Sequence, residues 1–345
     1  MTTATPPFEH AATATAVVVE ARGLGRSFKL HAPWPDRLLG RPRPGHIVAV
    51  DDVSFTIARG RTLALVGESG CGKSTLARLM VGLDAPTRGS AWLDRLDVHA
   101  TLAGSADAAR ALRRRMQMVF QDPYASLDPR WRVGDIVAEP LLEHGLVLPA
   151  QAPGRVAALL ASVGLDGIDV GRFPHQFSGG QRQRISIARA IATGPEFVVC
   201  DEPTSSLDVS VQAQVLNLLA DLQRDRALTC LFISHNLVVV RYVADDVGVM
   251  YLGRIVELAP RSELFPAPRH PYTRMLLAAV PDLRGRNRER APVLGEVPDP
   301  LAPPSGCTFH PRCPHANERC RVERPLLKPS GPVQVACHAV EEGRI

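Results

Sequence analysis

Lysine and long apolar runs are scarce in this chain of 345 residues. Only three lysines occur, Lys29, Lys73 and Lys328, against thirty-seven arginines, so a retained lysine points to chemistry that a guanidinium cannot perform. No apolar run approaches the roughly 18 to 20 residues that cross a bilayer. Residues 1–10 carry no basic segment ahead of a weakly apolar stretch, so no secretory signal is predicted. We therefore expect a cytosolic protein without a membrane-spanning helix.

Cysteine is also rare, and its placement is uneven. Seven cysteines are too few for a disulfide scaffold, which a reducing cytosol disfavours in any case. Four of them lie within the last 39 residues: Cys307, Cys313, Cys320 and Cys337. Proline gathers in the same region, because fifteen of the thirty prolines lie between Pro260 and Pro332. We expect residues 266–345 to form a Cys/Pro-rich extension built by turns and staples, without a large core.

Charge and composition are otherwise ordinary. Hydrophobic residues make up 45% and charged residues 22%, which excludes wholesale disorder, a coiled coil and collagen. The net charge is +5, but twelve basic and eight acidic residues follow residue 265, so most of the excess lies in the extension. The arginine run at residues 284–290 is interpreted as a solvated linker or as a contact with anionic lipid headgroups. It lacks interleaved aromatic residues, so no nucleic-acid partner is predicted.

Short apolar runs alternate with helical periodicity through the middle of the chain. Buried strands are predicted at residues 62–66, 116–120, 197–200 and 230–233, separated by helical stretches at 74–82, 133–172 and 209–224. Strands separated by helices predict a parallel sheet covered on both faces. Two further strands are predicted at residues 17–21 and 47–57, and a hairpin at 247–257. In the helix predicted at residues 74–82 and just after it, four apolar residues recur at helical spacing and are expected to form its buried face: Leu76, Leu79, Met80 and Leu83.

A glycine-rich segment follows the strand at residues 62–66 and precedes the first helix. It fits the phosphate-loop pattern G-x-x-x-x-G-K-[ST] and comprises Gly67, Glu68, Ser69, Gly70, Cys71, Gly72, Lys73, Ser74 and Thr75. Its glycines let successive N–H groups curl around phosphate oxygens, and the helix N-terminus adds its positive dipole end. Lys73 is predicted to reach the β and γ phosphates, and the Ser74 hydroxyl to ligate Mg²⁺. A chance glycine turn is the alternative, and the strand and helix context argues against it.

Two adjacent acids end the apolar strand at residues 197–200. Asp201 can hold the water shell of Mg²⁺, and Glu202 is then placed to polarise an attacking water. The alternative is that both acids only cap the turn before Pro203. The phosphate loop upstream favours the catalytic interpretation.

Four further segments resemble parts of one family, the ABC transporter ATPases. Ser178, Gly179, Gly180 and Gln181, in SGGQRQR, resemble the signature motif. Gln121 in VFQDPYASL resembles the Q-loop residue, His235 in FISH the H-loop histidine, and Asp208 in SSLD the D-loop. These motifs occur in family order over residues 17–265. The strings FQDPYASLDPR, HQFSGGQRQR, DEPTSSLDVSVQAQVL and GCTFHPRCPHA are similar to those of oligopeptide and dipeptide importer ATPases, specifically the F-type partner of their D/F pairs.

This resemblance implies an α/β P-loop NTPase fold. The expected parts are a RecA-like core with a parallel sheet, an antiparallel β subdomain, a helical subdomain at about residues 122–180, and the extension at 266–345. Residues 1–16 are predicted to be a mobile tail. The helical subdomain is expected to dock a permease.

The resemblance also implies how the site works. Two subunits meet head to tail, so each ATP lies between the phosphate loop of one chain and the signature of the other. The resemblance assigns catalysis to Glu202, His235, Gln121 and Lys73, and Mg²⁺ binding to Ser74, Gln121 and Asp201. Ser178, Gly179, Gly180 and Gln181 complete the partner's site, and Asp208 crosses the interface. Phe28 is expected to stack on adenine, with a plain strand core residue as the alternative.

The function implied is ATP hydrolysis coupled to uptake of di- and oligopeptides at the cytoplasmic face of the bacterial inner membrane. The implied partners are two permeases, a D-type ATP-binding subunit and an external binding protein. Nickel or glutathione import would use the same ATPase type. A different class, a soluble ABC ATPase acting on ribosomes or DNA, usually carries two nucleotide domains or a coiled-coil insertion, and this sequence has neither.

The four late cysteines follow the pattern C-x5-C-x6-C-x16-C. Four thiolates in a reducing compartment suggest a metal. Resemblance to family members with the string GCxFxPRCPxA favours a [4Fe-4S] cluster over Zn²⁺. Unliganded packing cysteines are the third alternative.

Overall fold

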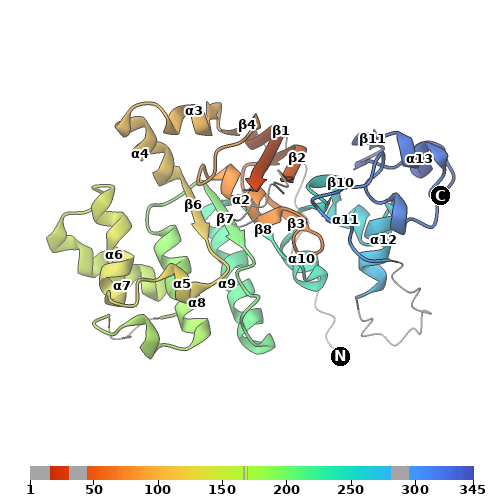
Figure 1. Ribbon diagram of the computed structural model, residues 1–345. Coiled ribbons are helices and arrows are strands. Elements are labelled where there is room, and N and C mark those ends of the chain that lie inside the picture. The colour runs from red at the N-terminus through yellow and green to blue at the C-terminus, as the bar shows by residue number, and fades with distance from the viewer. Residues whose placement is uncertain (1–15, 31–44, 166–167, 169, 281–294) are drawn as a thin grey trace, which may run out of the picture.

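Two β-sheets and the helices around them make up the molecule (Figure 1). The computed structural model describes residues 16–30, 45–165, 168, 170–280 and 295–345. The predicted tail at residues 1–16, apart from residue 16, and the predicted arginine run at 284–290 lie outside these residues.

The larger sheet has eight strands in the order β11-β12-β10-β9-β3-β8-β7-β6. Its parallel part is β6 (Met116–Val119), β7 (Phe197–Asp201), β8 (Thr229–Ile233), β3 (Thr62–Val66) and β9 (Asp246–Tyr251). The predicted parallel sheet is therefore confirmed. Antiparallel strands continue it at one edge: β10 (Arg254–Pro260), β12 (Val333–Val335) and β11 (Lys328–Ser330). The predicted hairpin is β9 and β10.

The smaller sheet is antiparallel and has the order β2-β1-β4-β5. Its strands are β1 (Val17–Leu30), β2 (Gly45–Ala58), β4 (Arg88–Leu93) and β5 (Leu96–Asp97). The prediction of a strand at residues 17–21 was too short. The prediction missed β4, which pairs with β1 and so completes the antiparallel subdomain.

Helices lie on both faces of the larger sheet, and α5 to α7 extend towards the left of Figure 1, where they pack on α8. The longer helices are α2 (Lys73–Met80), α4 (Ala106–Arg115), α6 (Val133–Glu143), α7 (Ala152–Ser162), α8 (Gly179–Ile191), α9 (Val209–Arg226), α10 (Leu237–Val243) and α12 (Pro271–Ala278). The short ones are α3 (Val98–Leu102), α5 (Pro123–Ser126), α11 (Arg261–Leu264), α13 (Glu318–Val322), α14 (His338–Glu341), η1 (Pro149–Gln151), η2 (Pro174–Gln176) and η3 (His310–Arg312). The block predicted as mostly helical at residues 133–172 is α6, η1 and α7.

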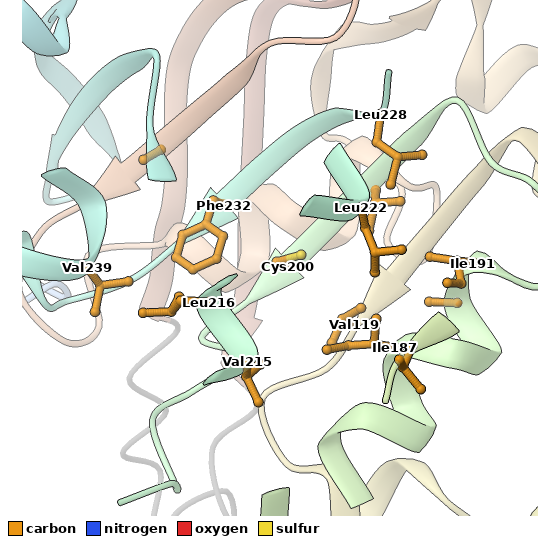
Figure 2. Packing of buried hydrophobic residues seen from close by; sticks show 14 of the residues in the cluster. Val119, Ile187, Ile191, Cys200, Val215, Leu216, Leu222, Leu228, Phe232 and Val239 are labelled. Atoms are coloured by element: carbon orange, nitrogen blue, oxygen red, sulfur yellow. The ribbon is translucent and has the colours of Figure 1, made fainter. Parts of the chain in front are cut away.

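Alternate residues of the parallel strands face two different cores. In β3, Leu63 and Leu65 pack with α2 and the smaller sheet, whereas Ala64 and Val66 pack on the opposite face. Figure 2 shows that second core, where Cys200 and Phe232 from the strands lie among side chains of α8, α9 and α10. Burying a large apolar side chain contributes roughly 1.5–3 kcal/mol, so these two layers hold the strand ends in place.

The first predicted helix is shorter than its apolar pattern. Leu76, Leu79 and Met80 are buried as predicted. The prediction for Leu83 was wrong, because its side chain is 54% exposed. The helix ends at Met80, and Gly82 then takes a left-handed φ of +71°, which turns the chain away from the core.

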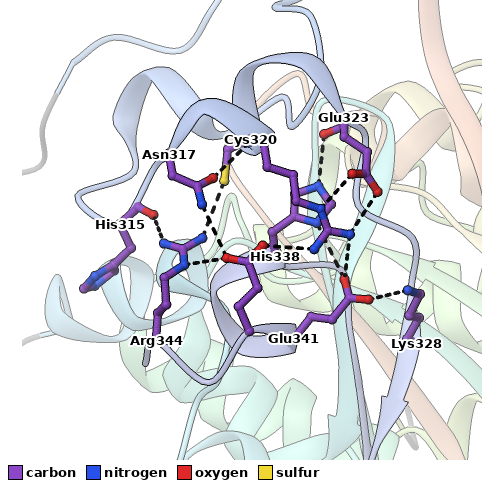
Figure 3. Close-up of polar contacts among 10 residues, drawn as sticks. His315, Asn317, Cys320, Glu323, Lys328, His338, Glu341 and Arg344 are labelled. Carbon is purple, nitrogen blue, oxygen red and sulfur yellow. Dashed lines mark hydrogen bonds and ion pairs between the residues drawn. The ribbon is translucent and has the colours of Figure 1, made fainter.

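The C-terminal extension was predicted to be built by turns and staples without a large core, but part of it packs into the core of the ATPase sheet. Strand β12 pairs with β10, and buried Phe309 and Val333 belong to the same apolar cluster as α8 and α9. An ion-pair network then staples the end of the chain (Figure 3). In that network Arg319 pairs with Glu323, Glu341 and Glu342. Strand β12, which follows residue 265, and strand β10, which precedes it, therefore belong to the same sheet.

Among the described residues, none of the helices has the length and apolar character required to cross a bilayer.

Candidate active site

The phosphate loop lies against the backbone of β9 and β2, and two of its glycines make this close approach possible. Gly67 has a φ of +156°, and a Cβ there would lie 2.2 Å from the carbonyl oxygen of Met250. Gly72 has a φ of +104°, and a Cβ there would lie 2.0 Å from the carbonyl oxygen of Ala49. Only glycine fits both positions. Gly72 is also the N-cap of α2, so the loop ends at the N-terminus of this helix as predicted.

Lys73 folds back over the loop that carries it. Its Nζ donates to the carbonyl oxygens of Gly67 at 2.8 Å and Glu68 at 3.0 Å. The side chain is buried, so the ammonium is surrounded by backbone oxygens in place of water. Phosphate oxygens offer the same donors a stronger, charged acceptor, which suits Lys73 to the predicted role.

Ser74 and Asp201 form the second part of the site. The Ser74 hydroxyl donates to Asp201 Oδ1 at 3.0 Å. Burial raises the pKa of Asp201, and the neighbouring Glu202 raises it further. A hydroxyl beside a buried carboxylate provides the hard oxygen ligands that Mg²⁺ prefers, so the residues present fit this cation.

Three polar side chains converge at the carboxyl ends of β6, β7 and β8. Gln121 Nε2 donates to Glu202 Oε2 at 3.1 Å, and His235 Nδ1 lies 3.1 Å from Glu202 Oε1. Glu202 has a left-handed φ of +44°, and its N–H donates to the carbonyl oxygen of Ile233 on the neighbouring strand. Asn236 accepts N–H bonds at the start of α10, which fixes the turn after His235. The structure thus brings together three residues that lie far apart in the sequence.

One cavity of about 840 Å³ joins these groups. Its lining includes Lys73 and Ser74 from the phosphate loop together with Gln121, Glu202 and His235. Strand β2 and the turn between β9 and β10 line it elsewhere. The extension contributes as well, through Pro300, Pro303, Thr308 and Arg324. A volume of this size lies within the range of small-molecule sites.

Phe28 lies beside this cavity without lining it. It pairs in register with Ile47, which does line the cavity, and its side chain is 36% exposed. The guanidinium carbon of Arg26 lies 4.8 Å from the centre of its ring. The exposed fraction argues against a plain core residue, and adenine stacking stays a prediction.

The signature segment lies away from the phosphate loop of its own chain. Ser178 is the N-cap of α8: its hydroxyl accepts from Gln181 N–H at 3.2 Å, and Gln181 Oε1 accepts from Ser178 N–H at 2.9 Å. A Cβ on Gly180 would lie 2.3 Å from Val211 Cγ1. Asp208 is the N-cap of α9, and its carboxylate accepts from Val211 N–H at 2.9 Å. None of these residues is among the described residues that line the cavity.

The four late cysteines are close enough to influence one another. Burial raises the pKa of Cys307 to about 12, and the thiols of Cys320, Cys337 and Cys313 add to the effect. All four are free thiols. Yet within the part of the chain that the structure describes, no three His, Cys, Asp or Glu side chains are placed to hold a metal ion. The geometry therefore gives no support to the predicted iron–sulfur or zinc site.

Sequence reasoning missed the contact between the extension and the phosphate loop. Arg312 forms two hydrogen bonds to the Glu68 carboxylate, at 2.8 and 2.9 Å, and the Tyr272 hydroxyl accepts from Glu68 N–H at 2.9 Å. Residues separated by 204 and 244 positions leave no local pattern that could have revealed these pairs.

Comparisons with known proteins agree with the geometry. Residues 50–205 match the family model described as ABC transporter, and residues 256–320 match that of the oligopeptide/dipeptide transporter C-terminal region. The chain is 51% identical over 301 residues to the di/tripeptide transport ATP-binding protein DppF of Pseudomonas aeruginosa, covering 86% of this chain and 92% of that one.

The chain belongs to the ABC transporter family.

Another relative of this ABC ATPase is the oligopeptide transport ATP-binding protein AppF of Bacillus subtilis, 47% identical over 91% of this chain and 95% of that one. Among solved structures, a dimeric post-hydrolysis state of the ATP-binding cassette MJ0796 bound to ADP and Pi superposes with a TM-score of 0.61. That match is 25% identical and covers 70% of this chain and 98% of the cassette. The predicted P-loop NTPase fold and the predicted ATPase activity, with ATP and Mg²⁺, are confirmed.

Proposed function

We propose that this ABC ATPase is the ATP-hydrolysing subunit of a bacterial importer for di- and oligopeptides. The convergence of Gln121, Glu202 and His235 beside the phosphate loop carries the catalytic part of the proposal. The peptide part is supported by the names of the relatives and by the family model that matches the extension.

The proposed reaction is transfer of the γ-phosphoryl group to water. Phosphate-loop N–H groups and Lys73 would bind the β and γ phosphates. Ser74, Asp201 and Gln121 would hold Mg²⁺, which would supply neutralisation of the phosphate charge. Glu202 accepts a proton from the attacking water as the oxygen bonds to phosphorus and the bond to the ADP oxygen breaks. His235 and Gln121 hold the Glu202 carboxylate in place through the two 3.1 Å contacts.

The proposed assembly is a head-to-tail pair of ATPases under two permeases at the cytoplasmic face of the inner membrane. Ser178 to Gln181 would then complete the site of a D-type partner, with Asp208 crossing the interface. Two features support this: the signature lies outside its own chain's cavity, and the related cassette is described as dimeric. Helices α5 to α7 would dock the permease, and an external binding protein would deliver cargo through it.

Metal binding by Cys307, Cys313, Cys320 and Cys337 stays a prediction, with a [4Fe-4S] cluster ahead of Zn²⁺. Iron and zinc analysis of anaerobically purified protein tests it. Folded protein containing neither metal would leave packing cysteines as the remaining interpretation.

The proposed function is tested by co-expression with peptide-importer permeases of the source organism and by uptake of labelled di- and oligopeptides in cells. We expect co-purification with both permeases, and uptake that Lys73→Ala abolishes. Lys328→Ala is the matched control, because Lys328 is exposed, pairs with Glu341 and is not among the described residues that line the cavity. Uptake of nickel or glutathione in place of peptides would reassign the cargo. Tight binding to ribosomes or DNA without permeases would refute the transport role.

A further inference from the structure

The extension grips the phosphate loop through the side chain of Glu68. Arg312 Nη1 and Nη2 donate to Glu68 Oε2 and Oε1 at 2.8 and 2.9 Å, a two-pronged geometry that fixes both position and orientation. The Arg312 side chain is only 2% exposed, and that of Glu68 is 27% exposed. Solvent screening is therefore weak around this pair, unlike that around the exposed pairs of the extension.

A second contact holds the backbone of the same residue. The Tyr272 hydroxyl accepts from Glu68 N–H at 2.9 Å. Tyr272 is completely buried, and burial raises its pKa, so the hydroxyl stays neutral. An N–H group at the start of the phosphate loop is thus committed to the extension, leaving the later N–H groups for a ligand.

Tyr272 is fixed by hydrogen bonds at the start of its helix and by packing against other aromatic rings. Helix α12, which carries Tyr272, begins at the buried carboxylate of Glu257, which accepts from the N–H groups of Arg269 and His270 at 2.8 and 2.9 Å. The ring of Tyr272 packs against those of Tyr251 and Phe309, at centroid distances of 4.7 and 5.4 Å. Movement of Tyr272 would disturb a filled core.

The Arg312 guanidinium is packed against the same rings. Its carbon lies 5.8 Å from the centre of Tyr251 and 5.9 Å from that of Phe309, within the range of cation–π attraction. One aromatic cluster therefore supports both groups that hold Glu68.

Lys73 holds the same peptide unit from inside the loop. Its Nζ donates to the carbonyl oxygens of Gly67 and Glu68, and it must leave both to reach a phosphate. Arg312 and Tyr272 hold Glu68 through other atoms, because Arg312 contacts its carboxylate and Tyr272 its N–H. We propose that Arg312 and Tyr272 are positioning residues that keep the phosphate loop in its ligand-ready curve, so that ATP affinity depends on the extension. This inference rests on the ATP site proposed above and is independent of the transported cargo.

Loss of either positioning residue should weaken ATP binding and leave the chemical step nearly unchanged. Neither Arg312 nor Tyr272 contacts Glu202, Gln121 or His235 in the hydrogen bonds described, so turnover at saturating ATP should change little. Loosening the loop should instead weaken ATP binding by roughly tenfold, a usual size for coupling between distinct parts of a protein.

The test uses the full-length ATPase and measures equilibrium binding of a fluorescent ATP analogue together with steady-state hydrolysis. We expect Arg312→Gln to raise the Kd and the KM for ATP by about tenfold with kcat within about twofold of wild type. Arg312→Lys, which keeps the charge but loses the two-pronged geometry, should restore only part of the affinity. Tyr272→Phe removes the acceptor of Glu68 N–H and should raise Kd in the same direction. Arg321→Gln is the matched control, because Arg321 is an exposed arginine of the same extension that pairs with Glu318 at 3.7 Å.

If Arg312→Gln does not fold, Glu68→Gln breaks the same contact from the other side and should raise the Kd in the same direction. If both single variants fold, the double variant Glu68→Gln/Arg312→Gln should bind ATP no more weakly than the weaker single variant, because both changes break one contact. An unchanged Kd in folded Arg312→Gln and Tyr272→Phe proteins, or an equal rise in Arg321→Gln, would overturn the inference. A wild-type protein that binds no ATP would refute the ATP site itself, which is a different result.

Discussion

Replacing Glu202 by Gln removes the proposed proton acceptor while keeping nearly the same shape. The Glu202 carboxylate receives Gln121 Nε2 on one oxygen and faces His235 Nδ1 with the other, each at 3.1 Å. A Gln side chain keeps one oxygen for Gln121 and presents an amide NH₂ towards His235. Its φ of +44° is unchanged, so the backbone strain at this position is the same in both proteins.

The expected effects on stability and on catalysis differ in size. At most one hydrogen bond is lost, which costs about 1 kcal/mol of unfolding free energy. Loss of a general base costs roughly 10²- to 10⁴-fold in rate, or about 2.7–5.4 kcal/mol at 1.36 kcal/mol per tenfold. ATP binding should be kept, because Lys73, Ser74 and the phosphate loop are untouched. The variant should therefore bind ATP, fold normally and hydrolyse it very slowly.

Steady-state phosphate release at saturating ATP measures this directly, beside binding of a fluorescent ATP analogue. Glu318→Gln serves as the control, because its side chain is 81% exposed and lies in the extension. A kcat within about threefold of wild type would refute the role of Glu202. A parallel loss of ATP binding and hydrolysis would equally contradict the reasoning, since it would make Glu202 a binding group.

The remaining predictions concern the loop, pH and the aromatic cluster. Gly67→Ala places a methyl group 2.2 Å from the Met250 carbonyl oxygen, so nucleotide titration should show at least tenfold weaker binding, unlike Gly154→Ala, where nothing lies within 4 Å of the added Cβ. Burial lowers the pKa of His270 to about 3, so the unfolded chain binds a proton at this residue more readily than the folded protein does. The free energy of unfolding should therefore fall as the pH drops from about 6.5 towards 3, by up to about 1.36 kcal/mol per pH unit. His270→Asn keeps a helix-capping side chain but should flatten that slope in urea unfolding at pH 4 to 7, and an equal slope would show that His270 is not the cause. Phe309→Ala removes a buried ring and should lower the unfolding free energy by about 3–5 kcal/mol. The control Leu326→Ala, at an exposed position, should cost less than about 0.5 kcal/mol. A loss below about 1 kcal/mol in Phe309→Ala would contradict the packing described.

Sequence predicted those parts of the site whose chemistry is carried by contiguous residues. The phosphate loop needs glycines, a lysine and a hydroxyl at fixed spacing. The structure places the glycines between β3 and α2, and Lys73 and Ser74 in the first turn of α2. Strand β7 and its terminal acids were predictable because an apolar run ends at Asp201 and Glu202. The convergence of Gln121 and His235 on Glu202 was implied by family resemblance, and the parallel strand order accounts for it, because β6 and β8 both flank β7.

The parts that escaped prediction depend on contacts between distant residues. Strands β11 and β12 have three residues each, and one contains a proline, so they show no alternating pattern. Their pairing with β10 is nevertheless what joins the extension to the ATPase sheet. Arg312 belongs to the cysteine-bearing string GCTFHPRCPHA, and nothing local indicates that it lies against Glu68.

The pairing of Glu68 with Arg312 also has a consequence for biosynthesis. The two residues are 244 positions apart, and at the usual rate of about 5–20 residues per second roughly 12 to 50 s pass between their syntheses. During that interval β3, α2 and the phosphate loop are already made, but the groups that hold Glu68 are not. A chain still attached to the ribosome is thus expected to bind ATP weakly. High nucleotide affinity is then gained only near the end of translation, when the extension that contains Tyr272 and Arg312 has been made.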